Sequence, residues 1–407
     1  MSGPLAGVRV LDLSRILAGP TATQLLSDLG AEVIKIERPG AGDDTRGWGP
    51  PFLQDADGQD TRESAYYLCA NRGKKSVAVD LAHEDGQQII RDLAARSDIL
   101  IENFKVGGLA KYGLDYASLS AAHPQLIYCS ITGFGQTGPL SHRAGYDFLI
   151  QGMGGIMSLT GEPGRDPMKV GVGIADVMCG MYANVAILSA LHARASTGRG
   201  QHIDVSLLDA QLAWLINQGQ AYLVDGQIPP QRGNEHPTIV PYGTFPAADR
   251  AFILAIGNDG QFARFCAVAG RPAVAEDPRF ARNADRVRNR EVLIPLLNEI
   301  TAERTAADWI TALDDKAVPC GPINNLAEAF AQPQARAREM TVSLPHPVSG
   351  SLDMIANPIR MSDTPVTYQG APPLLGAHTD TVLSEVLGAS PEQLDAWRTA
   401  GAIGETT

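Results

Sequence analysis

One aspartate in this sequence stands among glycines in an otherwise apolar segment, surroundings that would allow covalent chemistry. The stretch PMKVGVGIADVMCGMYA places Asp176 near the start of a predicted helix, with Gly171, Gly173 and Gly180 close by in otherwise apolar sequence. A carboxylate that is poorly hydrated but ionised is a usable nucleophile, and glycines leave room for a thioester to approach. The helix dipole also favours an acidic residue in any first turn, so on the residues alone a plain structural aspartate has the advantage.

Basic residues gather in two segments next to predicted strands. The loop ERPGAGDDTRGWGPP contains Arg38 and Arg46, and NRGKKS contains Arg72 directly before a strand. Arginine suits sites that bind carboxylates or phosphates, because its planar guanidinium donates two parallel hydrogen bonds. Since loops on a rigid scaffold commonly carry sites, a binding role is favoured over a solvated turn.

Several other chemistries lack the residues that they need. The turn SRILAGPTA lacks the GxGxxG pattern of dinucleotide-binding sites. The sequence also lacks the GxSxG motif that is typical of serine hydrolases. The eight histidines show no HExxH spacing, and the five cysteines no CxxC spacing. The sequence therefore predicts reduced, mostly buried thiols and an enzyme with no metal and no bound cofactor.

The elements that position these residues begin with alternating strands and helices, which predict a doubly wound α/β sheet. Strands are expected at 7–13, 31–37, 76–80, 98–101 and 125–130. A helix that ends at Gly30 joins the first two strands, and such a βαβ unit places the turn after the first strand at a ligand-accessible sheet edge.

The rest of the chain predicts long core helices and a second, smaller domain. A helix is expected at 174–195, and a strand leading into one helix at 201–223. A connection rich in glycine and proline follows at 223–242. Beyond it we expect a strand at 251–256 and helices at 261–269, 290–303, 306–312 and 379–387.

Length and charge exclude several classes of protein. A chain of 407 residues exceeds the ~250–300 residues at which single cores stop growing, so two domains are expected. The formal net charge of −12 argues against nucleic acid as a partner. Since neither a leader peptide nor an apolar run of ~18 residues is present, we expect no membrane segment and a cytoplasmic location.

An ordered series of motifs resembles the class III CoA-transferases, the family named for carnitine and bile-acid CoA-transferases. The motifs include GVRVLDLSRILAGPTATQLLSDLGAEVIKIERPGAGDDTRGWGP, NRGKKSVAVDL, DILIENF, ITGFGQTGP, RAGYD, GVGIAD, TGRGQHIDVSLLDA, GPINN and PPLLGAHT. The resemblance implies a Rossmann-like large domain from 1–222 and 331–407, and a small α+β domain from 223–330. It also implies that two chains interlock as a homodimer.

The resemblance also assigns roles to individual residues. The family's catalytic aspartate falls on Asp176, which would form an acyl anhydride and then a CoA thioester, with no ATP or metal. Backbone amides near Gly171 and Gly173 would stabilise the oxyanions. The positions that match CoA-binding residues are Leu17, Ala18, Arg38, Asn103, Phe104 and Lys111, and those that match residues lining the active site are Tyr146 and Asp147.

Two alternatives remain beside a transferase. Racemases of 2-methylacyl-CoA share this fold, but they carry a histidine before the aspartate of RAGYD, where this chain has Tyr146. Tyrosine, with an ordinary pKa near ~10, is a poor base at neutral pH. A CoA-binding or scaffold protein without catalysis is the other alternative, and the presence of Asp176 among its glycines argues against it.

Within the family, the motifs are most similar to enzymes that use succinyl-CoA with glutarate or related C4 to C5 dicarboxylates, such as itaconate or malate. The glycine-rich loop of the formyl and oxalyl branch is absent, so oxalate is less expected. A dicarboxylate needs a cation for its second carboxylate. Arg72 is the first candidate, with Arg46 and His236 behind it.

Overall fold

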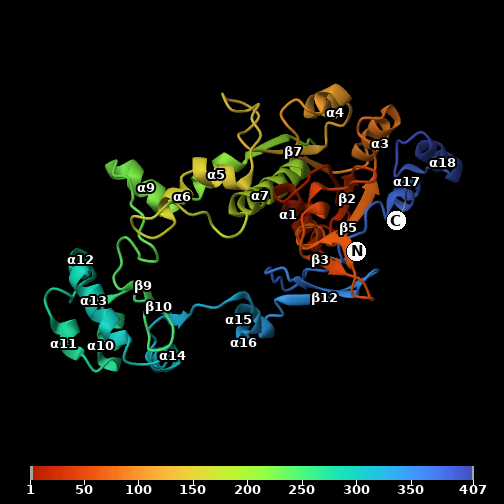
Figure 1. The fold of residues 1–407 in the computed structure, drawn as a ribbon. Coiled ribbons are helices and arrows are strands. Elements are labelled where there is room, and N and C mark those ends of the chain that lie inside the picture. Colours follow the sequence, from red (N-terminus) through yellow and green to blue (C-terminus); the bar gives the residue numbers. More distant parts are fainter. Residues whose placement is uncertain (1–2, 406–407) are drawn as a thin grey trace. The chain divides into compact units, whose positions relative to one another are not determined.

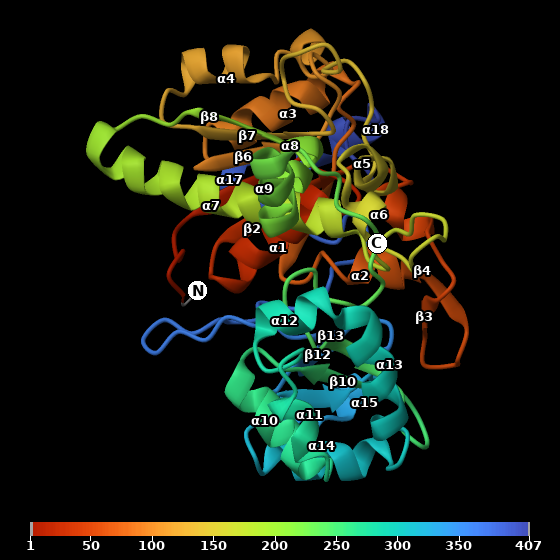
Figure 2. The ribbon, with the colours of Figure 1, turned by 90° about the vertical axis from the view of Figure 1, so that its left-hand side faces the viewer.

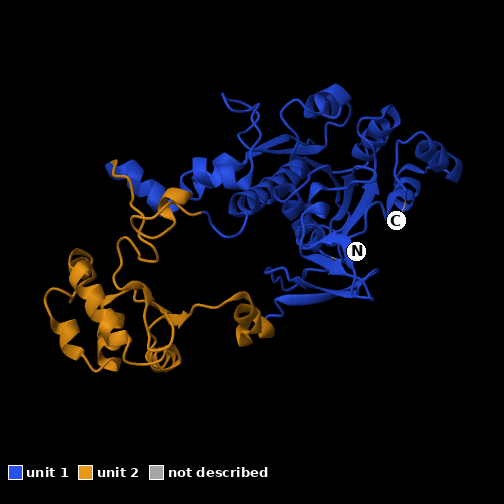
Figure 3. Ribbon diagram, viewed as in Figure 1, with its two compact units in different colours: residues 1–156, 169–225, 338–407 blue, residues 157–168, 226–337 orange. Residues whose placement is uncertain are grey.

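The structure, a computed structural model, describes residues 3–405, which divide into two compact units (Figure 3). The larger unit comprises Met1–Ile156, Lys169–Asp225 and Arg338–Thr407. The smaller unit comprises Met157–Met168 and Gly226–Ala337. The short segment Met157–Met168 belongs to the smaller unit although most of its sequence neighbours belong to the larger, which the sequence pattern did not indicate.

A parallel six-stranded sheet forms the centre of the larger unit, in the order β5-β2-β1-β6-β7-β8. Its strands are β1 (Arg9–Asp12), β2 (Glu32–Glu37), β5 (Lys74–Ala78), β6 (Ile99–Glu102), β7 (Ile127–Thr132) and β8 (His202–Ser206). All five strands expected in the first third are present, because fully buried parallel strands are short continuous apolar runs. Strand order reverses between β1 and β6, and the carboxyl ends of the strands at such a switch point form a crevice for ligands.

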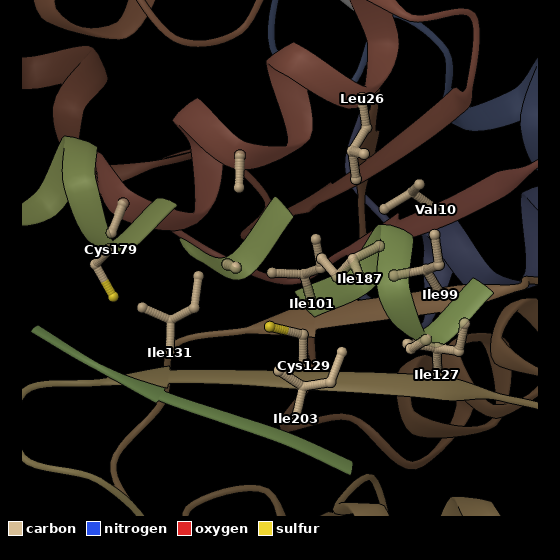
Figure 4. Packing of buried hydrophobic residues seen from close by; sticks show 14 of the residues in the cluster. Val10, Leu26, Ile99, Ile101, Ile127, Cys129, Ile131, Cys179, Ile187 and Ile203 are labelled. Atoms are coloured by element: carbon tan, nitrogen blue, oxygen red, sulfur yellow. The ribbon is translucent and has the colours of Figure 1, made fainter. Parts of the chain in front are cut away.

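One face of the sheet is covered by α1 (Ala18–Asp28) and α7 (Ile174–Thr197). Figure 4 shows Leu26 of α1 and Ile187 of α7 packed with isoleucines of the central strands, among them Ile101. These side chains are fully buried. The two helices therefore lock onto the strands whose carboxyl ends form the crevice.

The opposite face is covered by α3 (Glu84–Ala94) and α17 (Thr379–Leu387), near the carboxyl end of the chain (Figure 1). Ile90 of α3 and Leu383 of α17 share a buried cluster with Val77 of β5. The last part of the chain thus completes the sheet that its first part begins.

The two helices on the first face approach each other closely at a glycine. A Cβ added to Gly180 of α7 would lie 2.6 Å from the carbonyl oxygen of Ala18 in α1, so only glycine permits this contact. Ala18 begins α1, and Gly180 lies one turn after Asp176. The contact therefore brings the first turns of both helices together at the crevice.

Smaller elements complete the larger unit. They are β3 (Phe52–Gln54), β4 (Asp60–Ser64), α2 (Ala65–Leu68), α4 (Tyr116–Ala122), α5 (Asp147–Met153), α8 (Leu207–Ala213), α9 (Ile216–Asp225), β12 (Thr341–His346), β13 (Gly350–Ile355) and α18 (Pro391–Thr399), with short 3₁₀ helices at Asp44–Gly47 and Ala110–Tyr112. The prediction of a single helix after β8 is wrong. Two helices are present, because the backbone of Ile216 takes a left-handed conformation (φ +40°) that interrupts the helix.

The smaller unit combines a three-stranded antiparallel sheet, order β11-β10-β9, with helices (Figure 2). Its elements are β9 (Tyr242–Phe245), β10 (Phe252–Ala255), α10 (Asp259–Val268), α11 (Pro272–Glu276), α12 (Asn283–Arg288), α13 (Arg290–Thr301), α14 (Ala306–Asp314), β11 (Cys320–Pro322), α15 (Leu326–Ala331) and α16 (Pro333–Ala337), while α6 (Ile156–Leu159) lies at the boundary of the units. Trp309 is buried against Phe252 and Phe265 and donates its indole N–H to the carbonyl of Thr301 at 2.7 Å.

The cysteines form no disulfide. All five are free, with Cys129, Cys179 and Cys266 buried and Cys69 exposed. The expectation of mostly buried thiols is confirmed.

Candidate active site

A buried polar network fixes the turn between β1 and α1. The carboxylate of Asp12, at the end of β1, accepts hydrogen bonds from the backbone N–H of Ser14 (2.9 Å), the hydroxyl of Thr23 (2.6 Å) and the ammonium of Lys74 (3.2 Å). Burial opposes ionisation of Asp12, but the charges of Lys74 and Lys35 outweigh it and lower the pKa. The turn is thus tied both to the first helix and to β5.

The next residues of this turn hold a strained backbone. Ile16 has φ +71°, a conformation that β-branched residues rarely adopt and that is found at functional sites. Its N–H donates to the carboxylate of Asp43 (3.2 Å), which also accepts from the ammonium of Lys35 (2.9 Å). This buried pair holds Ile16 at the crevice. No sequence signal marked Ile16, because strain depends on partners far along the chain.

A cavity of about 470 Å³ opens where β1, β6 and β7 end. Of the residues proposed from sequence, it is lined by Leu17, Ala18, Asn103, Phe104, Lys111, Tyr146 and Asp176; Arg15, Ile16, Lys105, Thr132, Gly133 and Arg143 also line it. The structure therefore brings most of the expected CoA positions together with the expected nucleophile. Gly171 and Gly173, the expected source of oxyanion amides, do not line it.

Asp176 lies in the first turn of α7, and a second carboxylate holds that turn. Asp147 accepts the backbone N–H of Ala175 at 2.8 Å and that of Asp176 at 3.4 Å through the same oxygen. Its other oxygen accepts from the amide of Gln151 at 2.7 Å. Asp147 therefore caps α7 from α5 and positions Asp176, rather than lining the cavity itself.

The environment of Asp176 makes its carboxyl group less acidic than an exposed aspartate. Burial, together with the negative charge of Asp147, raises the pKa of Asp176 to about 7. A carboxylate with this pKa is poorly solvated and more nucleophilic than a free one, yet a large fraction remains ionised at neutral pH.

This pKa predicts a pH dependence. Only the ionised form of Asp176 can attack, so kcat/KM for an acyl-CoA should fall about tenfold per pH unit below about 7. An Asp147→Asn variant keeps an acceptor for the Ala175 N–H but removes the negative charge, so its acidic limb should move to lower pH. Initial rates of both proteins over pH 5 to 9 check this, because titration of the substrate is common to both. An unchanged limb would contradict the assigned cause.

Arg72 has no free guanidinium for a substrate. It is buried, and it binds both oxygens of Asp28 (2.9 and 2.7 Å) and the carbonyl of Ile355 (2.7 Å). It lies outside the cavity of Asp176. The choice of Arg72 for the second carboxylate is corrected accordingly, since its charge is already neutralised within the fold.

Arg46 is held in the same way. Its guanidinium binds Glu37 (2.8 and 2.9 Å) and Glu63 (2.8 Å) and lies 3.7 Å from the ring centre of Tyr67. With Arg38 it lines a separate cavity of about 740 Å³ in the larger unit. The expectation that Arg46 binds the second carboxylate of the substrate is therefore corrected as well. Arg38, an expected CoA contact, does not line the cavity of Asp176.

His236 belongs to the smaller unit and lines neither of these two cavities. Its ring lies 5.2 Å from that of Tyr242, and its Nδ1 accepts the backbone N–H of Thr238 at 3.2 Å. Burial, with the charge of Arg290, lowers the pKa of His236, which makes it a neutral side chain rather than a cation at neutral pH. Among residues 3–405, no cluster of three or more histidine, cysteine or acidic side chains is arranged to hold a metal ion.

Comparison with known proteins points to one family. The family model described as CoA-transferase family III matches residues 5–379. The succinate–glutarate CoA-transferase of Agrobacterium fabrum is 49% identical over 383 residues, covering 94% of this chain and 96% of the relative. The human succinyl-CoA:glutarate CoA-transferase is 41% identical over 402 residues, covering 99% of this chain and 90% of the relative.

A solved structure has the same fold. The crystal structure of a CAIB/BAIF family protein from Brucella suis superimposes with a TM-score of 0.85 at 49% identity, covering 95% of this chain and all of that one. The match by sequence and the match by structure span nearly the whole chain, and the protein belongs to CoA-transferase family III.

Proposed function

We propose that this enzyme transfers CoA from succinyl-CoA, or a similar acyl-CoA, to a C4 to C5 dicarboxylate such as glutarate, itaconate or malate. The observation that carries the proposal is Asp176, a carboxylate with a raised pKa that faces a cavity at the switch point of a parallel sheet. The names of the relatives that are 41–49% identical supply succinate and glutarate, and itaconate and malate are added from the motif resemblance. The proposal needs neither a metal nor a bound cofactor.

The first half of the proposed reaction moves CoA onto the protein. A carboxylate oxygen of Asp176 attacks the thioester carbonyl, the C–S bond breaks, and an acyl-aspartyl anhydride and CoA thiolate form. The thiolate then attacks the aspartyl carbonyl, and the donor acid leaves as its carboxylate. The product is a thioester between Asp176 and CoA.

The second half returns the chemistry to the acceptor. The acceptor carboxylate attacks the aspartyl thioester, which releases CoA thiolate and forms a new anhydride. The thiolate attacks the acceptor's carbonyl, and Asp176 leaves as a carboxylate. Each step exchanges one acyl bond for another, so the energy of the thioester is retained.

The walls of the cavity suit CoA in this scheme. Leu17, Ala18, Asn103 and Phe104 offer apolar and amide surface beside Asp176, and the charge of Lys111 attracts phosphate groups. Arg38 is kept as a proposed CoA contact at the other cavity of the larger unit.

The observed site favours a transferase over a 2-methylacyl-CoA racemase. Racemisation needs a base that removes an α-proton, and within the described residues no histidine lines the cavity of Asp176. Tyr146 stands where the racemases carry histidine, and a phenol is a poor base at neutral pH.

The proposed state is an interlocked homodimer of two-domain chains in the cytoplasm, without a nucleic-acid or membrane partner. Between residues 3 and 405, α7 is the one helix long and apolar enough to span a membrane by length and composition. One side of α7 packs in the core, and its other side exposes apolar residues: Met181, Tyr182, Val185 and Leu188. A second copy of this chain would cover such a face, because exposed apolar patches mark interfaces.

A panel of acceptors tests the function. Purified protein with succinyl-CoA is incubated with glutarate, itaconate, malate, mesaconate or oxalate, and the CoA esters are identified by mass spectrometry. New dicarboxyl-CoA esters are expected, with glutarate among the best acceptors and oxalate the poorest. If no ester forms and a chiral 2-methylacyl-CoA loses its configuration, the enzyme is a racemase.

A further inference from the structure

Four basic side chains line the cavity that contains Asp176: Arg15, Lys105, Lys111 and Arg143. Arg15 is paired with Asp44 at 2.7 Å, and the ammonium of Lys111 lies 4.5 Å from the ring centre of Tyr112. Within residues 3–405, the structure shows no ion pair for Arg143. Of the two arginines that line the cavity, Arg15 is already paired with a carboxylate, and Arg143 is the one available to bind a carboxylate of the substrate.

The segment that carries Arg143 is fixed against the end of β7. A Cβ on Gly145 would lie 2.4 Å from the Cα of Gly133, so the two backbones touch and both positions require glycine. The guanidinium of Arg143 lies 5.7 Å from the ring centre of Phe134, which is buried. Arg143 itself is exposed, so its guanidinium is accessible to a ligand, while the ring of Phe134 limits the orientations that it can take.

The same segment is attached to the nucleophile. Asp147, four residues after Arg143, accepts the N–H groups of the first turn of α7. Four residues of chain span at most about 14 Å, and the arginine side chain covers part of that distance. Arg143 and Asp176 therefore line the same cavity, and the segment 143–147 links their positions.

We propose that Arg143 binds the second carboxylate of the acid, the one that does not react, and so selects dicarboxylates over monocarboxylates. This inference rests on the proposed function and names its specificity residue. The planar guanidinium matches a carboxylate with two hydrogen bonds. Because one Asp176 serves donor and acceptor in turn, the same arginine would hold the free carboxylate of succinyl-CoA and later that of glutarate.

The other cations are better suited to CoA itself. Lys105 lies in the loop after β6 and Lys111 in the short 3₁₀ helix that follows it, near Asn103 and Phe104, which the family resemblance assigns to CoA. A flexible ammonium is a point charge that suits phosphate without selecting for the acyl group. Lys105, with no ion pair among residues 3–405, is the matched control for Arg143.

A competition between two acceptors tests the proposal. Glutarate and valerate have the same chain length, but valerate lacks the second carboxylate. Both acids are given together with saturating succinyl-CoA, and the initial ratio of glutaryl-CoA to valeryl-CoA is measured by mass spectrometry. The ratio depends only on how the common aspartyl-CoA thioester partitions, so weaker donor binding in a variant does not affect it.

In Arg143→Gln, the ratio should fall about 30-fold, because a charge-assisted contact is lost for glutarate alone. Arg143→Lys should restore part of the ratio, and Lys105→Gln should leave it unchanged. An unchanged ratio in Arg143→Gln, or an equal fall in both esters, would overturn the assignment of Arg143 while the transferase function stands. If the wild-type protein forms no glutaryl-CoA, the proposed function itself fails, and the assignment fails with it.

Discussion

Replacing Asp176 by asparagine is expected to lower the rate of CoA transfer by at least about 10⁴-fold, because the amide cannot form the anhydride through which every turnover passes. The substitution changes almost no volume, and the backbone N–H groups that Asp147 accepts remain in place. Loss of activity without loss of fold is therefore expected. Initial rates with succinyl-CoA and glutarate, together with thermal unfolding of both proteins, measure the two quantities separately.

The covalent step has a direct readout as well. Wild-type protein given succinyl-CoA without an acceptor should gain the mass of CoA at a peptide that contains Asp176, and the asparagine variant should not. Asp209→Asn is the matched control, since Asp209 is also an acid in the first turn of a helix and lies outside the cavity. Transfer by Asp176→Asn at more than a hundredth of the wild-type rate would contradict the mechanism.

The role of Asp176 shows how far the residues alone carry the prediction. An aspartate in a helix's first turn is common, so its chemistry followed from the ordered motifs rather than from the local pattern. The structure adds the physical reason, which is burial beside Asp147 at the carboxyl end of the sheet. Asp147 and Asp176 lie on different helices, 29 positions apart in the sequence, so no local pattern predicts that they are close together.

The central sheet was predictable for the opposite reason. Strands β1, β2, β6 and β7 of the central sheet are short, buried and largely apolar runs, and the signal of each is local. The break between α8 and α9 was not, because an isoleucine at φ +40° carries no local mark. The short hairpin of β3 and β4 was missed because β3 has only three residues and every residue of β4 is polar.

The arginines were misassigned because their partners are distant in sequence. Arg72 pairs with Asp28, 44 residues away, and Arg46, in the 3₁₀ helix Asp44–Gly47, pairs with Glu37 of β2 and Glu63 of β4. A sequence shows that a cation is present but not whether the fold already neutralises it. Burial decides this point, because a buried charge needs a partner within the fold, whereas an exposed charge is solvated by water and remains available to a ligand.

Replacing Arg46 by methionine should lower the free energy of unfolding by about 3–5 kcal/mol, because the carboxylates of Glu37 and Glu63 would remain buried without their shared cation. Methionine keeps much of the side-chain volume and its contact with Tyr67, so lost packing contributes little. Urea unfolding at pH 7 measures the change. The matched control is Arg62→Met, at an exposed arginine next to Glu63 in β4. The free energy of unfolding of this variant should stay within about 0.5 kcal/mol of the wild type.

The dependence of this loss on pH separates charge from packing. Burial opposes ionisation of Glu37, but the bonds and charge of Arg46 outweigh it and lower its pKa, so in the wild type this group contributes stability above the unfolded pKa and loses it as the pH falls. Without Arg46, the charge of Lys35 and the hydroxyl of Ser76 would still oppose the effect of burial, but less strongly, so the pKa of Glu37 should rise relative to the wild type. The variant should therefore approach the wild type in stability as the pH is lowered from 7 to 5, since protonation relieves the unpaired charge. A deficit that stays constant over this range would show that Arg46 stabilises the fold by packing rather than by its charge.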